Sequence, residues 1–464
     1  MNEESMDIVQ QFTPPQDDTF KLLSGHKESV FCVDFDSTGK FLVSGGQDHI
    51  AIIWNVVTGQ TEFTCRGHED SVHCVSFSPD GSYLCTGDMA GSIRVWLRPM
   101  ETENPIEWRL LTTLNVGDLL WIQWWSPPLK GTKITSGLPN PAVLLAGDDD
   151  GLVTVWPVRP TLANNTANHA KCLSGTGHAA LDGLILPSSL NTDKPKLVVL
   201  YRNGDLRLWD LKTEQVLDSI QLFSSHSSLS NLCRSLEVFQ LISPQSFIIQ
   251  SKCTNLTPIV GVDQHDLLLI TGNGFICPVS VKYDTEMLNS RLKILDVLKM
   301  DDDGSIEALS CSWTHPLFAF GSITGVLGIC DTQTISIRQK WTYIDEDDGQ
   351  PIGITSLLWS RYQPVFFTAT VKASIVAWSG VTGTIERTST GSVKDPSPLK
   401  IWWGHKAMIL DLTLLSFHRV TSETAIDDGN KTSEALKKTE LYIEPFLCTA
   451  SDDTTVRLFK IDIP

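Results

Sequence analysis

FLVSGGQDHIAIIW, residues 41–54, is the stretch that decides the fold. It contains an apolar run, a turn of small residues, and then alternating apolar residues that close on Trp54. Two short apolar runs joined by a tight turn predict a β-hairpin. The same phrase recurs at 84–96 (LCTGDMAGSIRVW), 144–156 (LLAGDDDGLVTVW), 197–209, 365–378 and 446–459, with two degenerate copies at 268–281 and 317–330. The chain therefore contains eight units of one kind.

A second phrase precedes several of these units. Gly-His pairs stand at Gly25-His26, Gly67-His68, Gly177-His178 and Gly404-His405. Each pair leads into a further apolar run, such as SVFCVDF, which predicts a strand before the hairpin, and a fourth strand then runs toward the next unit. Four antiparallel strands per unit, repeated around an axis, predict an all-β fold, a single eight-bladed β-propeller of the WD-repeat type.

The two ends of the chain predict how the ring closes. Only five residues follow Phe459, so the last blade lacks its fourth strand, whereas TFKLLS (19–24) precedes the first Gly-His pair and has no blade of its own. We expect residues 19–24 to supply the missing strand and close the ring. The expected organisation is a short acidic tail at 1–16 and a propeller at 17–464, with a polar insert at 419–441 in the last blade.

The repeats resemble those of the WD-repeat family, and this resemblance implies that a hydrogen-bonded set of His, Ser or Thr, Asp and Trp holds each blade together. The first blade has the complete set, formed by His26, Ser44, Asp48 and Trp54. In the second blade Ala90 replaces the Asp, and in the last blade Phe459 replaces the Trp. His26, Ser44 and Asp48 could also be taken for a catalytic triad, but because the His recurs in several blades we interpret it as a buried structural group.

Composition limits the partners. The chain has 36 Lys+Arg against 54 Asp+Glu, a formal net charge of −18. This balance argues against direct nucleic-acid binding and favours a basic protein partner. Eleven cysteines without a paired framework predict reduced thiols in the cytosol or nucleus. No secretory signal, membrane span, catalytic motif, metal site or cofactor motif stands out, so we expect a non-enzymatic monomer in the cytoplasm, with the nucleus as a further location.

Acidic residues gather in two sets of loops that a propeller of this strand order places on one face. These are the leading loops, which run into the innermost strands, and the hairpin turns before the closing residues; we call this the top face. Acidic residues are also common in exposed turns for local reasons. Trp121 lies near Asp118, which takes the His place of a degenerate Gly-His pair, and it could contact a ligand or pack in the core. The predicted partner-binding residues are Glu69, Asp70, Asp88, Asp118, Trp121, Asp148, Asp149, Asp301, Asp302, Asp303, Glu346, Asp347, Asp348 and Asp452.

Several stretches resemble one family of WD-repeat proteins. GHKESVFCVDF, GHEDSVHCVSFSPDG, CTGDMAGSIRVW and VGDLLWIQWWSP resemble the angio-associated migratory cell protein family, and GHKAMILDLTLL with its polar insert resembles the fungal members. The resemblance covers about residues 17–464. It implies a dedicated chaperone that binds the basic N-terminal segment of a newly made large-subunit ribosomal protein (universal large-subunit protein sixteen) and escorts it to the pre-60S particle. The alternatives are a general WD-repeat scaffold, such as a ubiquitin-ligase receptor or signalling adaptor, and an enzyme that uses the central channel.

Overall fold

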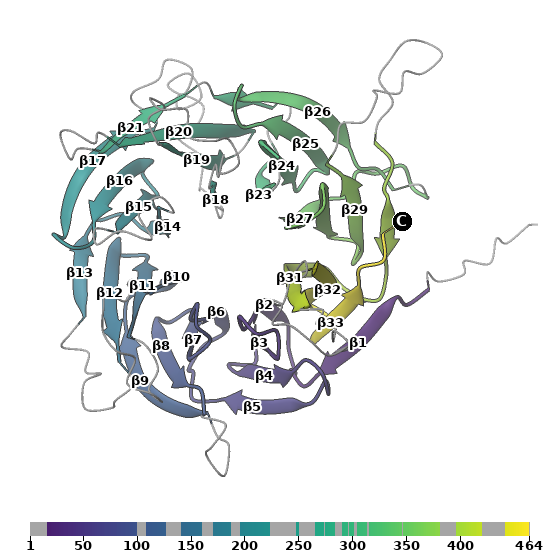
Figure 1. Cartoon of the computed structure of the whole chain (residues 1–464), viewed down its shortest axis with the longest axis horizontal. Helices are drawn as coiled ribbons and strands as arrows, with labels where there is room; N and C mark the ends of the chain where they lie inside the picture. Colours follow the sequence, from purple (N-terminus) through teal and green to yellow (C-terminus); the bar gives the residue numbers. More distant parts are fainter. Residues whose placement is uncertain are drawn as a thin grey trace, which may run out of the picture.

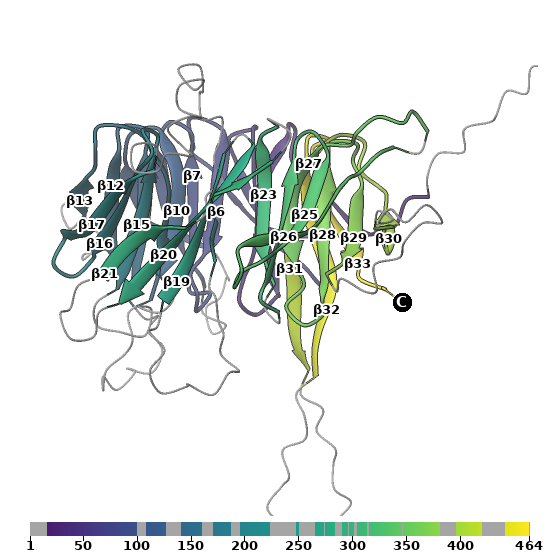
Figure 2. The ribbon, with the colours of Figure 1, turned by 90° about the horizontal axis from the view of Figure 1, so that it is seen from above.

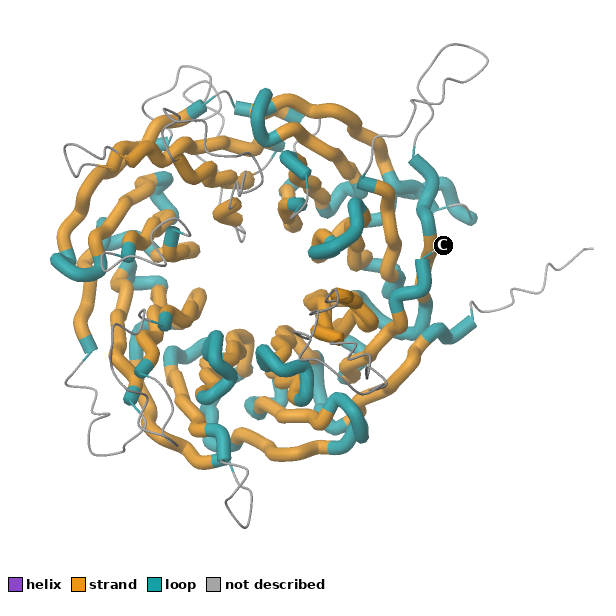
Figure 3. The backbone as a smooth tube through the Cα atoms, in the orientation of Figure 1, coloured by secondary structure: helices purple, strands orange, loops and turns teal. Residues whose placement is uncertain are grey.

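The fold is a ring of β-sheets. A computed structural model describes residues 16–99, 108–126, 141–159, 170–186, 195–222, 247–249, 265–272, 274–283, 290–295, 297–300, 304–312, 315–345, 347–380, 396–419 and 441–463. Regular structure in these residues consists of β-strands, and none of them forms a helix long and apolar enough to cross a membrane (Figure 3). The strands form eight antiparallel sheets arranged as blades around one axis (Figure 1). The predicted eight-bladed propeller is thereby confirmed.

The first four blades follow one another along the chain, each from its innermost strand outward. Blade 1 consists of β2 (Val30–Phe35), β3 (Phe41–Gly46), β4 (Ala51–Asn55) and β5 (Thr61–Cys65). Blade 2 consists of β6 (Val72–Phe77), β7 (Tyr83–Asp88), β8 (Ser92–Leu97) and β9 (Arg109–Asn115). Blade 3 consists of β10 (Leu119–Trp125), β11 (Ala142–Asp148), β12 (Leu152–Val158) and β13 (Lys171–Ser174). Blade 4 consists of β14 (Ala180–Ile185), β15 (Lys196–Tyr201), β16 (Asp205–Asp210) and β17 (Gln215–Gln221).

The other four blades complete the ring. Blade 5 consists of β18 (Phe247–Ile249), β19 (His265–Gly272), β20 (Phe275–Tyr283) and β21 (Ser290–Ile294), and β22 (Leu298–Lys299) also pairs with β20. Blade 6 consists of β23 (Ile306–Cys311), β24 (Leu317–Ser322), β25 (Val326–Asp331) and β26 (Ser336–Thr342). Blade 7 consists of β27 (Ile354–Trp359), β28 (Val365–Thr370), β29 (Ile375–Ser379) and β30 (Lys400–Trp402). Blade 8 consists of β31 (Ile409–Arg419), β32 (Leu441–Ser451), β33 (Thr455–Lys460) and β1 (Thr19–Ser24).

The N-terminal strand closes the ring, as the sequence predicts. β1 pairs antiparallel with β33 and forms the outer strand of blade 8 (Figure 1). The guanidinium of Arg457, on β33, is buried and donates hydrogen bonds to Asp17 Oδ2 (3.1 Å) and Thr19 Oγ1 (2.8 Å). The backbone of Asp18 also donates to the carbonyl of Trp403 at 2.8 Å. The residues just before β1 are therefore held to the last blade by side chains as well as by strand pairing.

The hydrophobic core lies between neighbouring blades. One cluster joins residues of blades 2 and 3, including Tyr83 and Trp156, and another joins blades 1 and 8, including Trp54 and Leu458. Because each middle strand has a neighbouring blade on both faces, strands such as β7 and β24 are buried along their whole length. This explains why the middle strands appear in the sequence as continuous apolar or small-residue runs.

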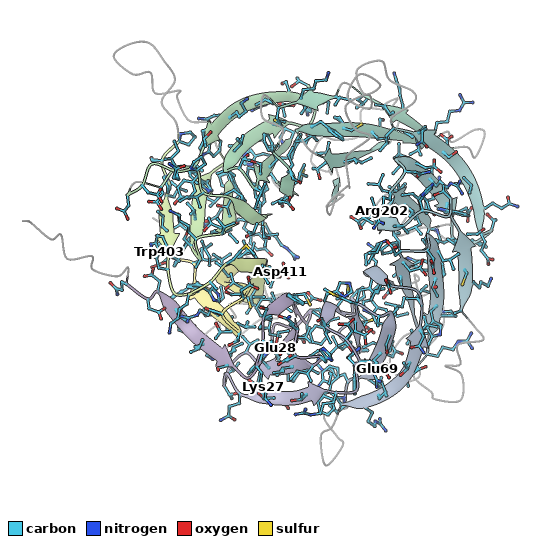
Figure 4. All side chains as sticks on the ribbon, turned by 180° about the vertical axis from the view of Figure 1, so that it is seen from behind. Lys27, Glu28, Glu69, Arg202, Trp403 and Asp411 are labelled. Atoms are coloured by element: carbon cyan, nitrogen blue, oxygen red, sulfur yellow. The ribbon has the colours of Figure 1, made fainter. Side chains whose placement is uncertain are left out.

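Hydrogen bonds between innermost strands also join neighbouring blades. One position of the innermost strand, in blades 1, 3 and 6, carries a side chain that accepts a backbone N–H from the innermost strand of the next blade. The pairs are Asp34 with Phe77 N–H (2.9 Å), Gln123 with Ile185 N–H (3.0 Å) and Ser310 with Trp359 N–H (3.2 Å). Asp411 of β31, at the inner edge of blade 8 in Figure 4, makes a similar bond to Val33 N–H of blade 1 at 3.0 Å.

The polar insert lies at the end of the longest hairpin. β31 and β32 pair from Ile409↔Ser451 to Arg419↔Leu441, and in Figure 2 this hairpin extends beyond the other blades. The far end of the hairpin, at Arg419 and Leu441, is opposite to the leading loop of the blade and so lies on the side away from the top face. Residues 420–440 of the insert and 1–15 of the predicted tail lie outside the described residues.

Candidate functional site

The top face is organised by one repeated backbone contact. In seven blades the first residue of the hairpin turn donates its N–H to a carbonyl of the leading loop of the same blade. The pairs are Gln47–Ser29 (2.8 Å), Met89–Ser71 (3.0 Å), Asp149–Asp118 (2.9 Å), Arg202–Ala179 (2.9 Å), Ile323–Ser305 (3.0 Å), Val371–Gly353 (3.0 Å) and Asp452–Met408 (3.1 Å). The two sets of loops therefore lie together, as the sequence predicts, and the seven turn residues occupy equivalent positions around the ring.

A buried hydrogen-bond chain supports this face in blade 1. Trp54 Nε1 donates to Ser44 Oγ at 2.8 Å, and the Ser44 hydroxyl lies 2.8 Å from His26 Nε2. His26 Nδ1 in turn lies 2.9 Å from Asp48 Oδ1. At these distances Ser44 and His26 can form one hydrogen bond and His26 can donate another to Asp48, so each polar side-chain atom of the set has a partner. Ser44 is fully buried, and the set acts as a clamp between leading loop and turn.

Blade 2 has the same chain, with a different carboxylate. Asp88, predicted to contact a partner, is fully buried, and its Oδ2 lies 2.9 Å from His68 Nδ1. His68 Nε2 lies 2.8 Å from Thr86 Oγ1, which accepts Trp96 Nε1 at 3.0 Å. The expectation that Ala90 breaks the set is therefore wrong, and Asp88 cannot meet a ligand at the surface because its carboxylate is enclosed by these donors.

In blade 3 the buried and the exposed acidic residues are not the ones that blade 1 would suggest. Asp148, predicted as a partner contact, is also buried, and it accepts the backbone N–H of Leu152 (2.8 Å) and Gly117 (3.3 Å). Asp150 stands where blade 1 has Asp48, but it is exposed. The reason is that Asp118 stands in the His place of this blade, so Asp150 has no imidazole to bind. Asp148 is a structural residue, and Asp150 joins Asp118 on the surface.

Trp121 packs between blades and is nearly buried. Its Nε1 donates to the carbonyl of Ala180 in blade 4 at 2.9 Å. Side chains built on Gly147 or Gly183 would lie 2.2 to 2.3 Å from its ring, so the indole is enclosed between two glycines of neighbouring blades. The packing alternative for Trp121 is therefore correct, and its predicted contact with a ligand is wrong.

Six acidic residues of the top face form what we call the acidic arc. Glu28, Glu69, Asp118, Asp150 and Asp347 are exposed and Asp452 is half-buried. Within the described part of the chain, their carboxylates have neither a cation nor a hydrogen-bond donor within bonding distance. They belong to blades 7, 8, 1, 2 and 3, which are consecutive because the ring closes between blades 8 and 1. Figure 4 shows Glu28 and Glu69 on neighbouring blades, with Arg202 of blade 4 beyond them.

Other predicted acids already have partners within the protein. Asp149 pairs with Arg202 at 2.8 Å, and Asp348 pairs with Lys372 at 2.9 Å. Lys372 also binds Asp345, and its hydrogen bonds lower the pKa of both carboxyls. Asp70 is half-buried and accepts the N–H of Ser71 at 2.6 Å. The predicted residues Asp301, Asp302, Asp303 and Glu346 lie outside the described residues.

Comparison with known proteins identifies the repeat. A profile of the WD40 family (WD domain, G-beta repeat) matches residues 18–55 and 59–96. The chain contains WD40 repeats. It is 28% identical over 401 residues to the human angio-associated migratory cell protein, covering 86% of this chain and 76% of that one. This similarity confirms the family resemblance that the sequence predicts.

Solved structures with a similar fold include two of Sqt1. The propeller matches Sqt1 of Saccharomyces cerevisiae with a TM-score of 0.65 and 17% identity, over 96% of this chain and 100% of that one. It matches Sqt1 of Chaetomium thermophilum with a TM-score of 0.64 and 17% identity over the same shares, in a structure bound to the N-terminus of ribosomal protein L10. At this identity the likeness shows a common fold.

The free carboxylates of the top face can pair with cationic groups of a ligand. Among the described residues, no group of three or more His, Cys, Asp or Glu side chains is placed to hold a metal ion. Sequence reasoning missed Asp150 and the turn residues Ile323 and Val371. An alignment of the units on the last residue of the strand before each hairpin turn would have revealed these positions. The residue that follows this strand is the one that contacts the leading loop.

Proposed function

We propose that the protein binds the basic N-terminal segment of a newly made large-subunit ribosomal protein on its top face. It would hold the segment without catalysing a reaction and escort it to the pre-60S particle. The observation that carries this proposal is the acidic arc, six carboxylates on five consecutive blades that have no cation of their own among the described residues. A segment rich in Lys and Arg supplies the counter-charges that the arc lacks.

The comparisons support this class of partner. The Chaetomium thermophilum Sqt1, whose fold this chain shares, is bound to the N-terminus of ribosomal protein L10. The human relative is 28% identical to this chain over 401 residues. A monomer that acts in the cytoplasm, with the nucleus as a further location, and that makes no direct contact with nucleic acid is part of the proposal.

The arc can act as a chaperone surface by charge alone. Hydrogen bonds between carboxylates and ammonium or guanidinium groups are stronger than neutral ones. The net charge of −18 attracts a basic segment from a distance, and salt screens this attraction over about 8–10 Å. While its cations are paired with the arc, the segment is kept from binding RNA non-specifically.

Calorimetric titration with a synthetic peptide of the N-terminus of ribosomal protein L10 tests the proposal. The double variant Glu69→Lys with Asp118→Lys should bind at least about tenfold more weakly at low salt, since each reversal replaces attraction by repulsion. Glu62→Lys, an exposed acid on the outer strand β5, is the matched control and should bind like the wild type. Equal binding by all three proteins at low salt would contradict the proposal.

A general WD-repeat scaffold is the second candidate, because the fold supports many kinds of binding surface. The two functions differ in what the protein captures. Affinity purification from cell extract followed by mass spectrometry should recover one basic ribosomal protein if the chaperone proposal holds. Recovery of ubiquitin-ligase or signalling subunits in its place would favour the scaffold.

A further inference from the structure

The seven equivalent turn residues of the top face differ in chemistry around the ring. Blades 8 and 3 present Asp452 and Asp149, and blade 4 presents Arg202. Blades 6 and 7, which are neighbours, present Ile323 and Val371, and Ile323 is 43% exposed. Blade 2 presents Met89, which is also 43% exposed but has no apolar turn residue on the blades beside it. Blades 6 and 7 therefore form an apolar sector beside the charged one.

Gly353 brings these two residues together. It lies in the leading loop of blade 7, and Val371 donates its backbone N–H to the Gly353 carbonyl at 3.0 Å. A Cβ atom on Gly353 would lie 2.4 Å from the Ile323 carbonyl oxygen and 3.2 Å from Val371 Cγ1. A side chain at position 353 would therefore clash, and the glycine leaves the space beside Ile323 and Val371 without one. We call Ile323, Gly353 and Val371 the apolar patch.

The apolar patch is continuous with the acidic arc. Lys372 follows Val371, and its ammonium is held by Asp345 and Asp348 of the same leading loop, so its charge is neutralised locally. Asp347, a member of the arc, lies on that loop as well. Ile344 precedes Asp345 and is 48% exposed. A bound segment can thus meet free carboxylates and exposed apolar side chains on the same blade.

We propose that the apolar patch accepts one apolar side chain of the basic segment, such as Leu, Ile or Tyr, between Lys or Arg residues that bind the arc. This inference rests on the proposed function and adds a determinant of specificity to it. Charge pairing alone accepts any basic chain, whereas an apolar contact requires a side chain of suitable chemistry at one position. Exposed apolar residues bordered by charged ones mark such contacts.

Peptides of equal charge test the inference. We would titrate a basic peptide of alternating Arg and Ser, and a series in which Leu replaces each Ser in turn. The best Leu peptide should bind the wild type about fivefold more tightly than the parent, and the ratio should persist at high salt, because apolar burial is not screened. The double variant Ile323→Ser with Val371→Ser should bind all members of the series alike.

The controls separate this inference from the function on which it rests. Val57→Ser changes an apolar residue that is 77% exposed in the β4–β5 turn, away from the top face, and should keep the preference for Leu. Thermal melting checks that both Ser variants are folded. Equal affinity of the wild type for every peptide, or a preference that survives in the double variant, overturns the apolar contact alone. If no peptide binds at all, the proposed function fails and the inference with it.

Discussion

His68 Nδ1 lies 2.9 Å from Asp88 Oδ2, the same distance that separates His26 Nδ1 from Asp48 Oδ1 in the preceding blade. The two carboxylates come from different positions of the repeat. Asp88 pairs across the sheet with the first residue of the innermost strand, where blade 1 has Gly46, and Asp48 stands two residues later. In both blades a carboxylate thus lies beside the His Nδ1, but it is supplied by different positions of the repeat.

Asp88→Ala should destabilise the protein without weakening ligand binding by the folded form. The change removes the acceptor of His68 Nδ1 and of the Ser92 backbone N–H, which is 2.8 Å from Asp88 Oδ1. Leaving buried donors unpaired costs about 1–3 kcal/mol of unfolding free energy. Urea unfolding measures this loss. Glu69→Ala, one residue from His68 and exposed, is the control and should lower peptide affinity while leaving stability unchanged. A stable Asp88→Ala protein that no longer binds peptide would make Asp88 a partner contact after all.

Removal of the closing strand should lower thermal stability. A protein that starts at residue 16 keeps β1 and the contacts of Arg457 with Asp17 and Thr19. One that starts at residue 25 loses them and leaves the edge of β33 unpaired. The buried guanidinium then keeps only its longer contacts with Thr455 (3.4 Å) and Asp453 (3.9 Å). The first truncation should melt close to the full chain, and the second several degrees lower. Identical melting curves would mean that β1 does not hold the ring closed.

The hydrogen bond between Asp34 of blade 1 and the Phe77 N–H of blade 2 predicts that the stability of the protein depends on pH. Burial raises the pKa of Asp34 to about 7, although the N–H of Phe77 favours its charged form. Burial also raises the pKa of Asp411, and the negative charge of Asp411 adds to the rise in the pKa of Asp34. The unfolded value for Asp is about 3.9, so between about pH 4 and 7 the folded protein binds the extra proton. The stability from this group is complete below that window and is lost as the pH rises through the folded pKa.

Asp34→Asn should remove this dependence. Asn keeps an oxygen that can accept the Phe77 N–H but cannot ionise. Relative to the variant, the wild type should lose unfolding free energy from about pH 4 to pH 7, at a slope of at most about 1.4 kcal/mol per pH unit. Denaturant unfolding at a series of pH values measures the difference, and Glu62→Gln on the outer surface is the control that should track the wild type. Parallel curves for wild type and Asp34→Asn would contradict a buried, protonated Asp34.

The repeated phrases explain why the fold could be predicted from the sequence. Each phrase encodes a hairpin whose two strands are buried on both faces, so apolar content and turn residues recur together. The closing strand was predictable as well, because 19–24 had strand character and no blade. The bonds between innermost strands could not be predicted, since Asp34, Gln123 and Ser310 perform one role with three side-chain types.

The candidate site was predictable as a face but not residue by residue. Alternation along a strand does not show whether the last residue, such as Asp88 or Asp148, turns inward to accept buried N–H groups. Ion pairs between residues of different blades also cannot be predicted from the sequence alone. Asp149 is 53 residues from Arg202, and nothing in either turn indicates that they meet. The acids left free for a partner emerge only once these pairs are subtracted.

The difference between the first two blades suggests a rescue experiment. Gly46 has no side chain, and a Cβ there would lie 2.7 Å from His26 Nδ1 and 2.8 Å from Asp48 Oδ1. Gly46→Asp should therefore destabilise the protein by crowding and by like charge. Asp48→Ala should also destabilise it, because His26 Nδ1 and the Lys27 N–H, 2.9 Å from Asp48 Oδ2, lose their acceptor.

Together the two changes give blade 1 the pattern of blade 2, in which Asp88 supplies the carboxylate and Ala90 stands two residues later. The new Asp can accept from His26 as Asp88 does from His68, and the Ala removes the carboxylate that would repel it. The double variant should therefore be more stable than the sum of the single effects predicts, with a coupling of about 1–3 kcal/mol. Urea unfolding of the wild type, both single variants and the double variant closes the cycle. Additive losses would mean that blade 1 cannot take its carboxylate from the strand end, and that the backbone around Gly46, more than the position of the charge, decides where the acid must stand.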